Sequence, residues 1–245
     1  MVASESVQSQ RRRRDRAALD EDRRNHIVQT NRILGALLGF DVIENHDTIN
    51  KKILPVIKDK IVATNIQTQT KYSFTSDKTD ISEINDNLHT HDEFSDLFFE
   101  IEKSLNIFFG KLKHINTNYF ITKSWATYTE KDKFIATHEH VASHFSFVYY
   151  VQINEDHSPL TFYESKTRFF MPDSSEWNDD NFQSMSYVCT PGMLIVFPSY
   201  LFHGTQKVNM TDVPRVSISG DIMITAKPGA VTEQLVPHPS TWRAI

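Results

Sequence analysis

The chain has little of what would place it in an oxidising compartment or a membrane. Cys189 is the only cysteine among 245 residues, so no internal disulfide can form, and a catalytic thiol is disfavoured. No apolar run approaches the roughly 20 residues that a membrane-spanning helix needs. Residues 1–14 contain arginines but no hydrophobic segment after them, as secretion would require. These absences predict a cytoplasmic protein with no membrane partner.

The chain also carries only a small excess of negative charge. The 26 basic and 31 acidic residues give a formal net charge of -5, which offers no general reason to expect a nucleic-acid partner. Residues 1–25 are polar and include the run Arg11 to Arg14 followed by mixed charges, which predicts a flexible N-terminal arm. The remaining residues, 26–245, are hydrophobic enough to form a single domain.

The first half of the chain predicts helices. Apolar residues recur at helical spacing in three segments, residues 27–38, 49–61 and 92–110, and residues 40–44 favour a short strand. Gly39 is placed to end the first helix, and Pro55 interrupts the second. Asp92 can cap the third helix, and Gly110 is placed to end it in a left-handed conformation.

The second half predicts strands, because β-branched and aromatic residues occur in short runs separated by Pro, Gly, Asn and Asp. The expected strands are residues 118–129, 145–153, 160–163, 186–188, 193–197, 205–208 and 215–224. Residues 164–181 favour a long loop that could cover the mouth of the barrel. The class expected from these patterns is mainly β (α+β), with a sandwich or barrel core.

Three histidines form a candidate metal site. His138 and His140 are two residues apart, so on an extended segment both point to one side while Glu139 points away. Glu139 could take the place of His140 if the segment bulges. The turn Pro191–Gly192 and the buried run after it carry the chain to His203. Three imidazoles from separate segments can bind a divalent metal and leave coordination positions open.

Arg215 and Ser217 form a candidate anion site. They lie two apart on the last expected strand and therefore share one face. A guanidinium that faces inward is costly to bury unless it meets an anion. The two residues can thus bind a carboxylate near the metal.

The order of these motifs resembles the 2-oxoglutarate/Fe(II)-dependent oxygenase superfamily. More narrowly, it is similar to a bacterial and phage subfamily in which histidine occupies the middle metal position. The resemblance rests on His-x-His, Ser-x-x-Ser-x-Val-Tyr-Tyr (residues 143–150), Pro-Gly-x-Leu-x-x-Phe-Pro-Ser-x-x-x-His (residues 191–203) and Arg-x-Ser. It implies a double-stranded β-helix, or jelly roll, over about residues 115–226, supported by the N-terminal helices.

The resemblance also implies a ligand set. His138 and His203 match the first and last iron ligands, and Arg215 with Ser217 matches the clamp for the far carboxylate of 2-oxoglutarate. His140 stands where the wider superfamily has Asp or Glu, so the site lacks one negative charge. Phe147 stands where the subfamily pattern usually has Gly. The implied cofactor is Fe(II), with 2-oxoglutarate and O2 as cosubstrates.

Further side chains are expected near this site. Ser146 and Tyr150 are candidates for hydrogen bonds to 2-oxoglutarate, and His144, Trp125 and Tyr128 for substrate contact or support of the metal. For Tyr150, Trp125 and Tyr128, the alternative is a place in the hydrophobic core.

The implied activity is hydroxylation of an unactivated C–H bond of a small molecule or peptide side chain, with release of succinate and CO2. One alternative is a cupin-like dioxygenase with three histidines that does not use 2-oxoglutarate. Another is a jelly-roll binding module without catalysis. Acidic residues in the 164–181 loop favour a cationic or peptide substrate over nucleic acid. A homodimer is compatible with the chain.

Overall fold

The computed structural model describes residues 32–33, 36–64, 71–73, 87–163, 184–205, 209–230 and 235–244. The chain divides into two units, Met1–Arg32 and Ile33–Ile245, and the second is the subject below. The predicted arm (residues 1–25) and the predicted loop (residues 164–181) lie outside the described residues. The assignment of residues 26–245 to one domain stays a prediction.

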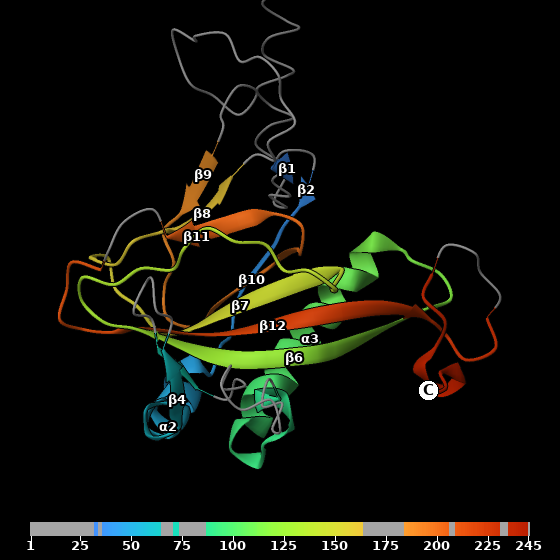
Figure 1. Ribbon diagram of the computed structural model, residues 1–245, viewed down its shortest axis with the longest axis horizontal. Helices are drawn as coiled ribbons and strands as arrows, with labels where there is room; N and C mark the ends of the chain where they lie inside the picture. The colour runs from blue at the N-terminus through green and yellow to red at the C-terminus, as the bar shows by residue number, and fades with distance from the viewer. Residues whose placement is uncertain are drawn as a thin grey trace, which may run out of the picture. The chain divides into compact units, whose positions relative to one another are not determined.

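A seven-stranded sheet forms the centre of the second unit (Figure 1). Its strands run in the order β3-β10-β7-β12-β6-β5-β4, and every neighbouring pair is antiparallel. Their bounds are β3 Gly39–Val42, β4 Ile61–Thr64, β5 Lys71–Ser73, β6 Thr117–Thr129, β7 Phe145–Gln152, β10 Met193–Pro198 and β12 Arg215–Ala226. Several paired strands, such as β3 with β10 and β6 with β12, are therefore far apart in sequence, as in a jelly roll.

A three-stranded antiparallel sheet in the order β11-β8-β9 faces the large sheet. It contains β8 Leu160–Tyr163, β9 Ser184–Tyr187 and β11 Phe202–Thr205. The observed strand β11 therefore begins three residues before the strand predicted at residues 205–208, and His203 lies within it. Together with the solved structures reported below, the two sheets confirm the predicted mainly β jelly-roll fold.

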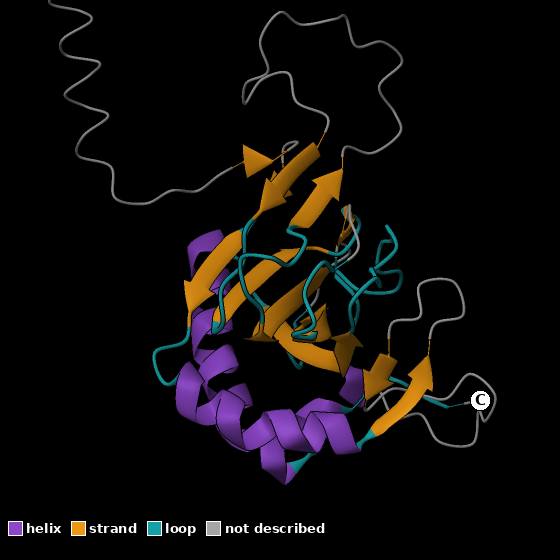
Figure 2. Ribbon diagram, turned by 90° about the vertical axis from the view of Figure 1, so that its left-hand side faces the viewer, coloured by secondary structure: helices purple, strands orange, loops and turns teal. Residues whose placement is uncertain are grey.

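Two helices cover the other face of the large sheet (Figure 2). They are α2 (His46–Asp59) and α3 (Ser95–Leu112), with 3₁₀ turns at Leu88–Thr90, Asp92–Phe94 and Pro239–Thr241. Pro55 lies within α2 without ending it. Asp92 starts a 3₁₀ turn instead of capping α3, and the left-handed residue at the end of α3 is Lys113, not Gly110.

The predicted helix at residues 27–38 is wrong where the structure describes it. Residues 32–33 and 36–37 form the short strands β1 (Arg32–Ile33) and β2 (Ala36–Leu37), and Gly39 begins β3. Ala36 and Leu38, two apart, are both buried, which is the period of a strand. A short apolar run does not distinguish the two periods. Strands β4 and β5 carry too weak a pattern to have been predicted.

The large sheet separates two hydrophobic cores. On β7, Phe147, Tyr149 and Val151 pack toward the helices, whereas Val148 and Tyr150 pack toward the small sheet. This alternation follows from the two-residue period of a strand. The helix-side core is apolar, and the side between the sheets also carries the polar residues of the candidate site.

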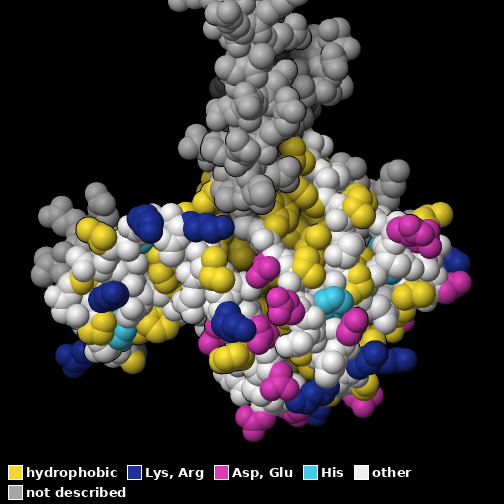
Figure 3. Space-filling view, turned by 180° about the vertical axis from the view of Figure 1, so that it is seen from behind, with side chains coloured by type: hydrophobic (Ala, Val, Ile, Leu, Met, Phe, Trp, Pro, Cys, Tyr) yellow, Lys and Arg dark blue, Asp and Glu magenta, His cyan; other side chains and the backbone are white. Residues whose placement is uncertain are grey.

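Two surface features bear on partners. No helix in the described part of the chain combines the length and apolarity needed to cross a membrane. On the face shown in Figure 3, acidic and basic side chains are interspersed rather than gathered into a basic patch.

Candidate metal and cosubstrate site

A backbone pairing brings His138 and His203 together. The His138 N–H donates to the His203 carbonyl oxygen and the His203 N–H donates to the His138 carbonyl oxygen, both at 2.9 Å. Gly204 permits this approach, because a Cβ there would lie 2.9 Å from the carbonyl oxygen of Ile135 and 3.0 Å from Thr137 Cα. The two histidines are therefore positioned by main-chain hydrogen bonds, which are insensitive to side-chain rotation.

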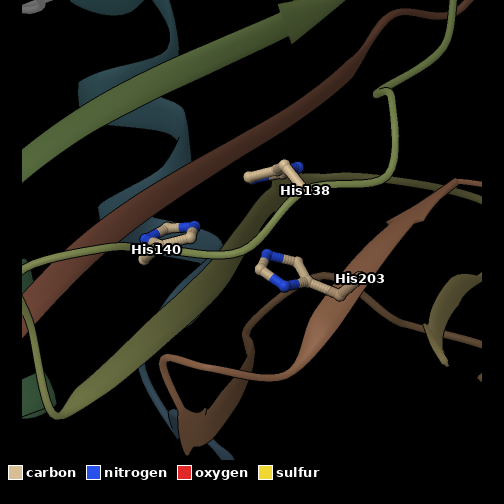
Figure 4. Close-up of side chains that lie close together, drawn as sticks. All are labelled: His138, His140 and His203. Atoms are coloured by element: carbon tan, nitrogen blue, oxygen red, sulfur yellow. The ribbon is translucent and has the colours of Figure 1, made fainter. Parts of the chain in front are cut away.

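His140 is held by the turn that follows β10. Its N–H donates to the Ser199 carbonyl oxygen at 3.0 Å, and the Ser199 N–H donates to the His144 carbonyl oxygen at 3.1 Å. Figure 4 shows the three imidazoles turned toward one another, two from the 138–140 segment and His203 from β11. Ring centroids lie 4.4 to 5.2 Å apart.

The three rings all present the same nitrogen to the space between them. Nδ1 of His138 lies 2.8 Å from the Ala136 carbonyl oxygen, and Nδ1 of His203 lies 2.8 Å from the Leu201 carbonyl oxygen. Nδ1 of His140 lies 2.5 Å from Asp221 Oδ1. Each partner can only accept from Nδ1, so each Nδ1 carries the hydrogen and each Nε2 keeps its lone pair. One ligand nitrogen from each ring lies within 4.8 Å of the others.

Two of these rings have a lowered pKa, although the His138 side chain is exposed whereas His203 is buried. Loss of water, followed by the neighbouring His138 and His140, lowers the pKa of His203 well below its usual value, and the charge of Arg215 acts in the same direction. Loss of water also lowers the pKa of His138. Neutral imidazole is the form that binds metal. The contribution of the Arg215 charge to this shift supports a predicted anion site near the metal site.

Arg215 is a buried cation with no counter-ion among the residues that the structure describes. Its side chain is 2% exposed. One terminal nitrogen donates to Tyr150 Oη at 3.2 Å, and the guanidinium lies 5.1 Å from the centre of that ring. Its Nε and its other terminal nitrogen have no hydrogen-bond partner among the described residues. Burial raises the pKa of Tyr150 well above its usual value, so the phenol stays neutral and cannot balance the charge.

The pairing of β12 with β6 and β7 places more polar groups beside Arg215. Thr129 is its direct neighbour on β6, and the buried Thr129 Oγ1 also lacks a partner among the described residues. Ser217, which is buried, lies opposite Thr127 on β6 and Tyr150 on β7. Unpaired buried donors of this kind are costly unless a ligand meets them.

Other predicted site residues are distributed around this centre. Trp125 stacks on His140, with ring centroids 5.5 Å apart. Ser146 donates to Asp221 Oδ1 at 2.9 Å and so lies beneath His140. His144 Nδ1 accepts from the Ile224 N–H. Tyr128 packs in the helix-side core, and Glu139 is exposed and outside the histidine cluster.

Three residues at this site were not predicted from the sequence: Thr129, Ser199 and Asp221. Asp221 is buried, at 5% exposed. A signal for it existed, because Arg215, Ser217 and Asp221 share one face of β12 by the two-residue period. A carboxylate in a mostly buried strand is unusual. Thr129 could be assigned only once the pairing of β6 with β12 was known.

A jelly roll that carries three converging imidazoles and a buried arginine defines a candidate metal-dependent oxygenase. Residues 123–221 match the family described as "Putative 2OG-Fe(II) oxygenase". This range contains the three histidines and Arg215, so the resemblance seen in the sequence is confirmed. This part of the chain is similar to the 2-oxoglutarate- and iron(II)-dependent oxygenases, oxidoreductases that use iron(II) and take 2-oxoglutarate as cosubstrate.

Solved structures share the fold. A 2OG-Fe(II) oxygenase family oxidoreductase from Burkholderia pseudomallei has a TM-score of 0.51 at 13% identity, covering 76% of this chain and 83% of its own. HygX from Streptomyces hygroscopicus, solved with nickel, 2-oxoglutarate and hygromycin B, has a TM-score of 0.52 at 10% identity (82% and 92% covered). A prolyl hydroxylase from Trichoplax adhaerens, in complex with a hypoxia inducible factor peptide fragment, has a TM-score of 0.50 at 10% identity (89% and 94% covered). Among curated proteins no relative matches.

Proposed function

We propose that the chain hydroxylates an unactivated C–H bond of a small molecule or a peptide side chain, with His138, His140 and His203 as iron(II) ligands and Arg215 as the carboxylate-binding residue. One observation carries this proposal. Three imidazoles with their Nδ1 atoms engaged adjoin a buried guanidinium with two unpaired nitrogens.

The donor set fits iron(II). Three neutral nitrogens suit a divalent metal of this kind and leave positions open for cosubstrate and O2. The hydrogen bonds at Nδ1 hold each ring in the tautomer that directs Nε2 inward. Iron(II) would supply the activation of O2, and the three histidines would hold the metal.

The pocket around Arg215 fits the far carboxylate of 2-oxoglutarate. Arginine binds carboxylates through charge-assisted N–H donors, and the Arg215 Nε and one terminal nitrogen have no partner among the described residues. Thr129 Oγ1 supplies a further donor next to them. Ser217 lies two residues after Arg215 on β12 and opposite Tyr150 on β7, and the Tyr150 hydroxyl accepts from Arg215. Their roles as cosubstrate contacts are part of the proposal.

The overall reaction balances with these components. One oxygen atom of O2 enters succinate as 2-oxoglutarate loses CO2, and the other enters the substrate, which exchanges C–H for C–OH. The contribution of the protein is to hold the reactants in place and to keep water out. The buried setting of Arg215, Tyr150 and His203 supports that contribution.

Substrate access is supported beside His140. An open, mostly apolar hollow there is lined by the segment 139–145 together with Pro198, Tyr200 and Ile224. Such a lining suits an apolar group of a small molecule or a peptide. The Streptomyces and Trichoplax structures hold hygromycin B and a peptide fragment, respectively, and both substrate classes are included in the proposal. A cytoplasmic location and a homodimer also stay proposals.

Anaerobic titration tests the function. Adding 2-oxoglutarate to the iron(II) protein should produce a visible charge-transfer band, and admitting O2 should release succinate. His203→Ala should abolish both, because one ligand is lost. Arg215→Met should raise the KM for 2-oxoglutarate at least about tenfold, since a charge-assisted pair contributes roughly 1.5–3 kcal/mol.

Lys131→Met is the matched control, because Lys131 is an exposed cation paired only with Asp212 among the described residues. It should leave the KM unchanged. Oxidation of a substrate with no band and no succinate would favour the three-histidine dioxygenase that does not use 2-oxoglutarate. Absence of both metal binding and succinate would favour a binding module.

A further inference from the structure

The ligand set of three imidazoles has no negative charge, yet a buried carboxylate lies directly behind it. Asp221 accepts the hydrogen bond of His140 Nδ1, and the two side chains are 7% and 6% exposed. The ladder fixes Asp221 at this position, opposite Ser146 on β7. No lysine or arginine in the described part of the chain forms an ion pair with it. Its charge is therefore available to His140.

A chain of hydroxyl groups supports this carboxylate from the other side. Ser146 Oγ donates to Asp221 Oδ1 at 2.9 Å, the same oxygen that faces His140. Ser146 Oγ also lies 2.8 Å from Ser199 Oγ, and Ser143 Oγ donates to Ser199 Oγ at 2.8 Å. The three hydroxyls form a connected network, which fixes Asp221 and leaves its ring-facing oxygen in place.

We propose that Asp221 is a positioning residue that replaces, from behind His140, the charge that a carboxylate ligand would supply. The inference rests on the proposed function, because it assigns His140 as a metal ligand. By holding the hydrogen on Nδ1, Asp221 directs Nε2 to the metal. Through the same hydrogen bond it makes the imidazole more electron-rich, as carboxylates behind metal-bound histidines do. His140 and Asp221 together then act as one negatively charged ligand.

A purely structural role for Asp221 makes a different prediction. The carboxylate also joins β12 to the 138–144 segment, so a bond of the same shape without charge would serve that purpose equally well. Asp221→Asn provides this comparison. Its amide oxygen, in the place of Asp221 Oδ1, can accept from both His140 Nδ1 and Ser146 Oγ. The hydrogen-bond geometry is kept while the charge is removed.

The first test measures metal affinity and redox potential. Asp221→Asn should bind iron(II), and cobalt(II) as an air-stable probe, roughly 10- to 100-fold more weakly. It should also raise the Fe(III)/Fe(II) potential, because the reduced ion is less sensitive to a lost negative charge. Ser143→Ala is the matched control, since it removes the hydroxyl at the far end of the same network but leaves the Asp221 charge and both of its hydrogen bonds. It should change affinity less than about threefold.

The second test needs neither a variant nor a metal. Nitrogen-15 NMR of the metal-free wild-type protein should show His140 with hydrogen on Nδ1 and a bare Nε2. A His140 ring with hydrogen on Nε2 would overturn the proposal, even if Asp221→Asn failed to fold. Unchanged affinity and potential in a folded Asp221→Asn protein would overturn it as well.

The two proposals fail in distinguishable ways. If the wild-type protein binds iron(II) and forms succinate while Asp221→Asn behaves identically, only the role of Asp221 is lost. If the wild-type protein binds neither iron(II) nor cobalt(II), the proposed function fails and the charge argument fails with it. In that case the NMR result would describe only a buried hydrogen bond.

Discussion

Phe147 and Gly220 lie directly opposite each other on β7 and β12. Phe147 is fully buried, and a Cβ at Gly220 would lie 2.5 Å from its ring and 2.9 Å from the Lys123 carbonyl oxygen. The phenyl ring therefore fills the space that the missing side chain leaves. Phe147 departs from the glycine of the subfamily pattern, and Gly220 is the local feature that accommodates it, one residue before Asp221.

This pairing predicts strong coupling between the two positions. Gly220→Ala should destabilise the protein by about 1–3 kcal/mol through overpacking, and Phe147→Ala by about 3–5 kcal/mol through cavity formation. The double variant should cost at least about 1 kcal/mol less than the sum, because the new methyl group then meets no ring. Urea unfolding measures all three free energies.

Gly110→Ala combined with Phe147→Ala is the control for this cycle. Nothing lies within 4 Å of a Cβ at Gly110, so the two effects should add within about 0.5 kcal/mol. Additive free energies for the Phe147 and Gly220 variants would contradict the direct contact.

At the scale of elements, α3 shows what sequence pattern does and does not determine. The helical spacing of Phe94, Leu97, Phe98, Ile101, Leu105 and Phe108 predicted the helix, and these residues are buried. Its end was misplaced, because a glycine can stop a helix or lie inside one. Gly110 lies inside α3 and Lys113 takes the left-handed conformation instead.

Gly110→Ala tests this assignment. An exposed glycine in a helix interior is about 0.5–1 kcal/mol less favourable than alanine, so the variant should be more stable by about that amount in urea unfolding. A loss of stability would instead indicate the left-handed conformation at residue 110 that the sequence predicted, since alanine is strained there.

The strands were predictable from the sequence, but the partners of each strand were not. Runs of β-branched and aromatic residues predicted β6, β7, β10 and β12 with bounds that nearly coincide with the observed ones. The sequence also grouped His138 with His140 and Arg215 with Ser217. It could not show that Thr129 lies beside Arg215 or that Asp221 lies behind His140, because strand register depends on pairing between distant segments.

At the scale of the whole molecule, the candidate site brings together residues from both sheets and from the segment between them. The ligands come from the 138–140 segment and β11, and Arg215 comes from β12. The site therefore links the large sheet to the small sheet. Any ligand that binds only the folded arrangement stabilises the folded protein by mass action. Metal and cosubstrate should thus be visible in the melting temperature as well as in activity.

Iron(II) under anaerobic conditions, or cobalt(II), at about 100 times its Kd should stabilise the protein by about 2.7 kcal/mol. For a chain of this size that corresponds to a rise in melting temperature of roughly 5–10 °C. A chelator should reverse the rise, and His203→Ala should not show it. Since binding free energies couple reciprocally, 2-oxoglutarate should raise the melting temperature further when metal is present than when it is absent. Equal shifts with and without metal would mean that the anion binds Arg215 without reaching the histidines, and the two sites would then be neighbours rather than parts of one centre.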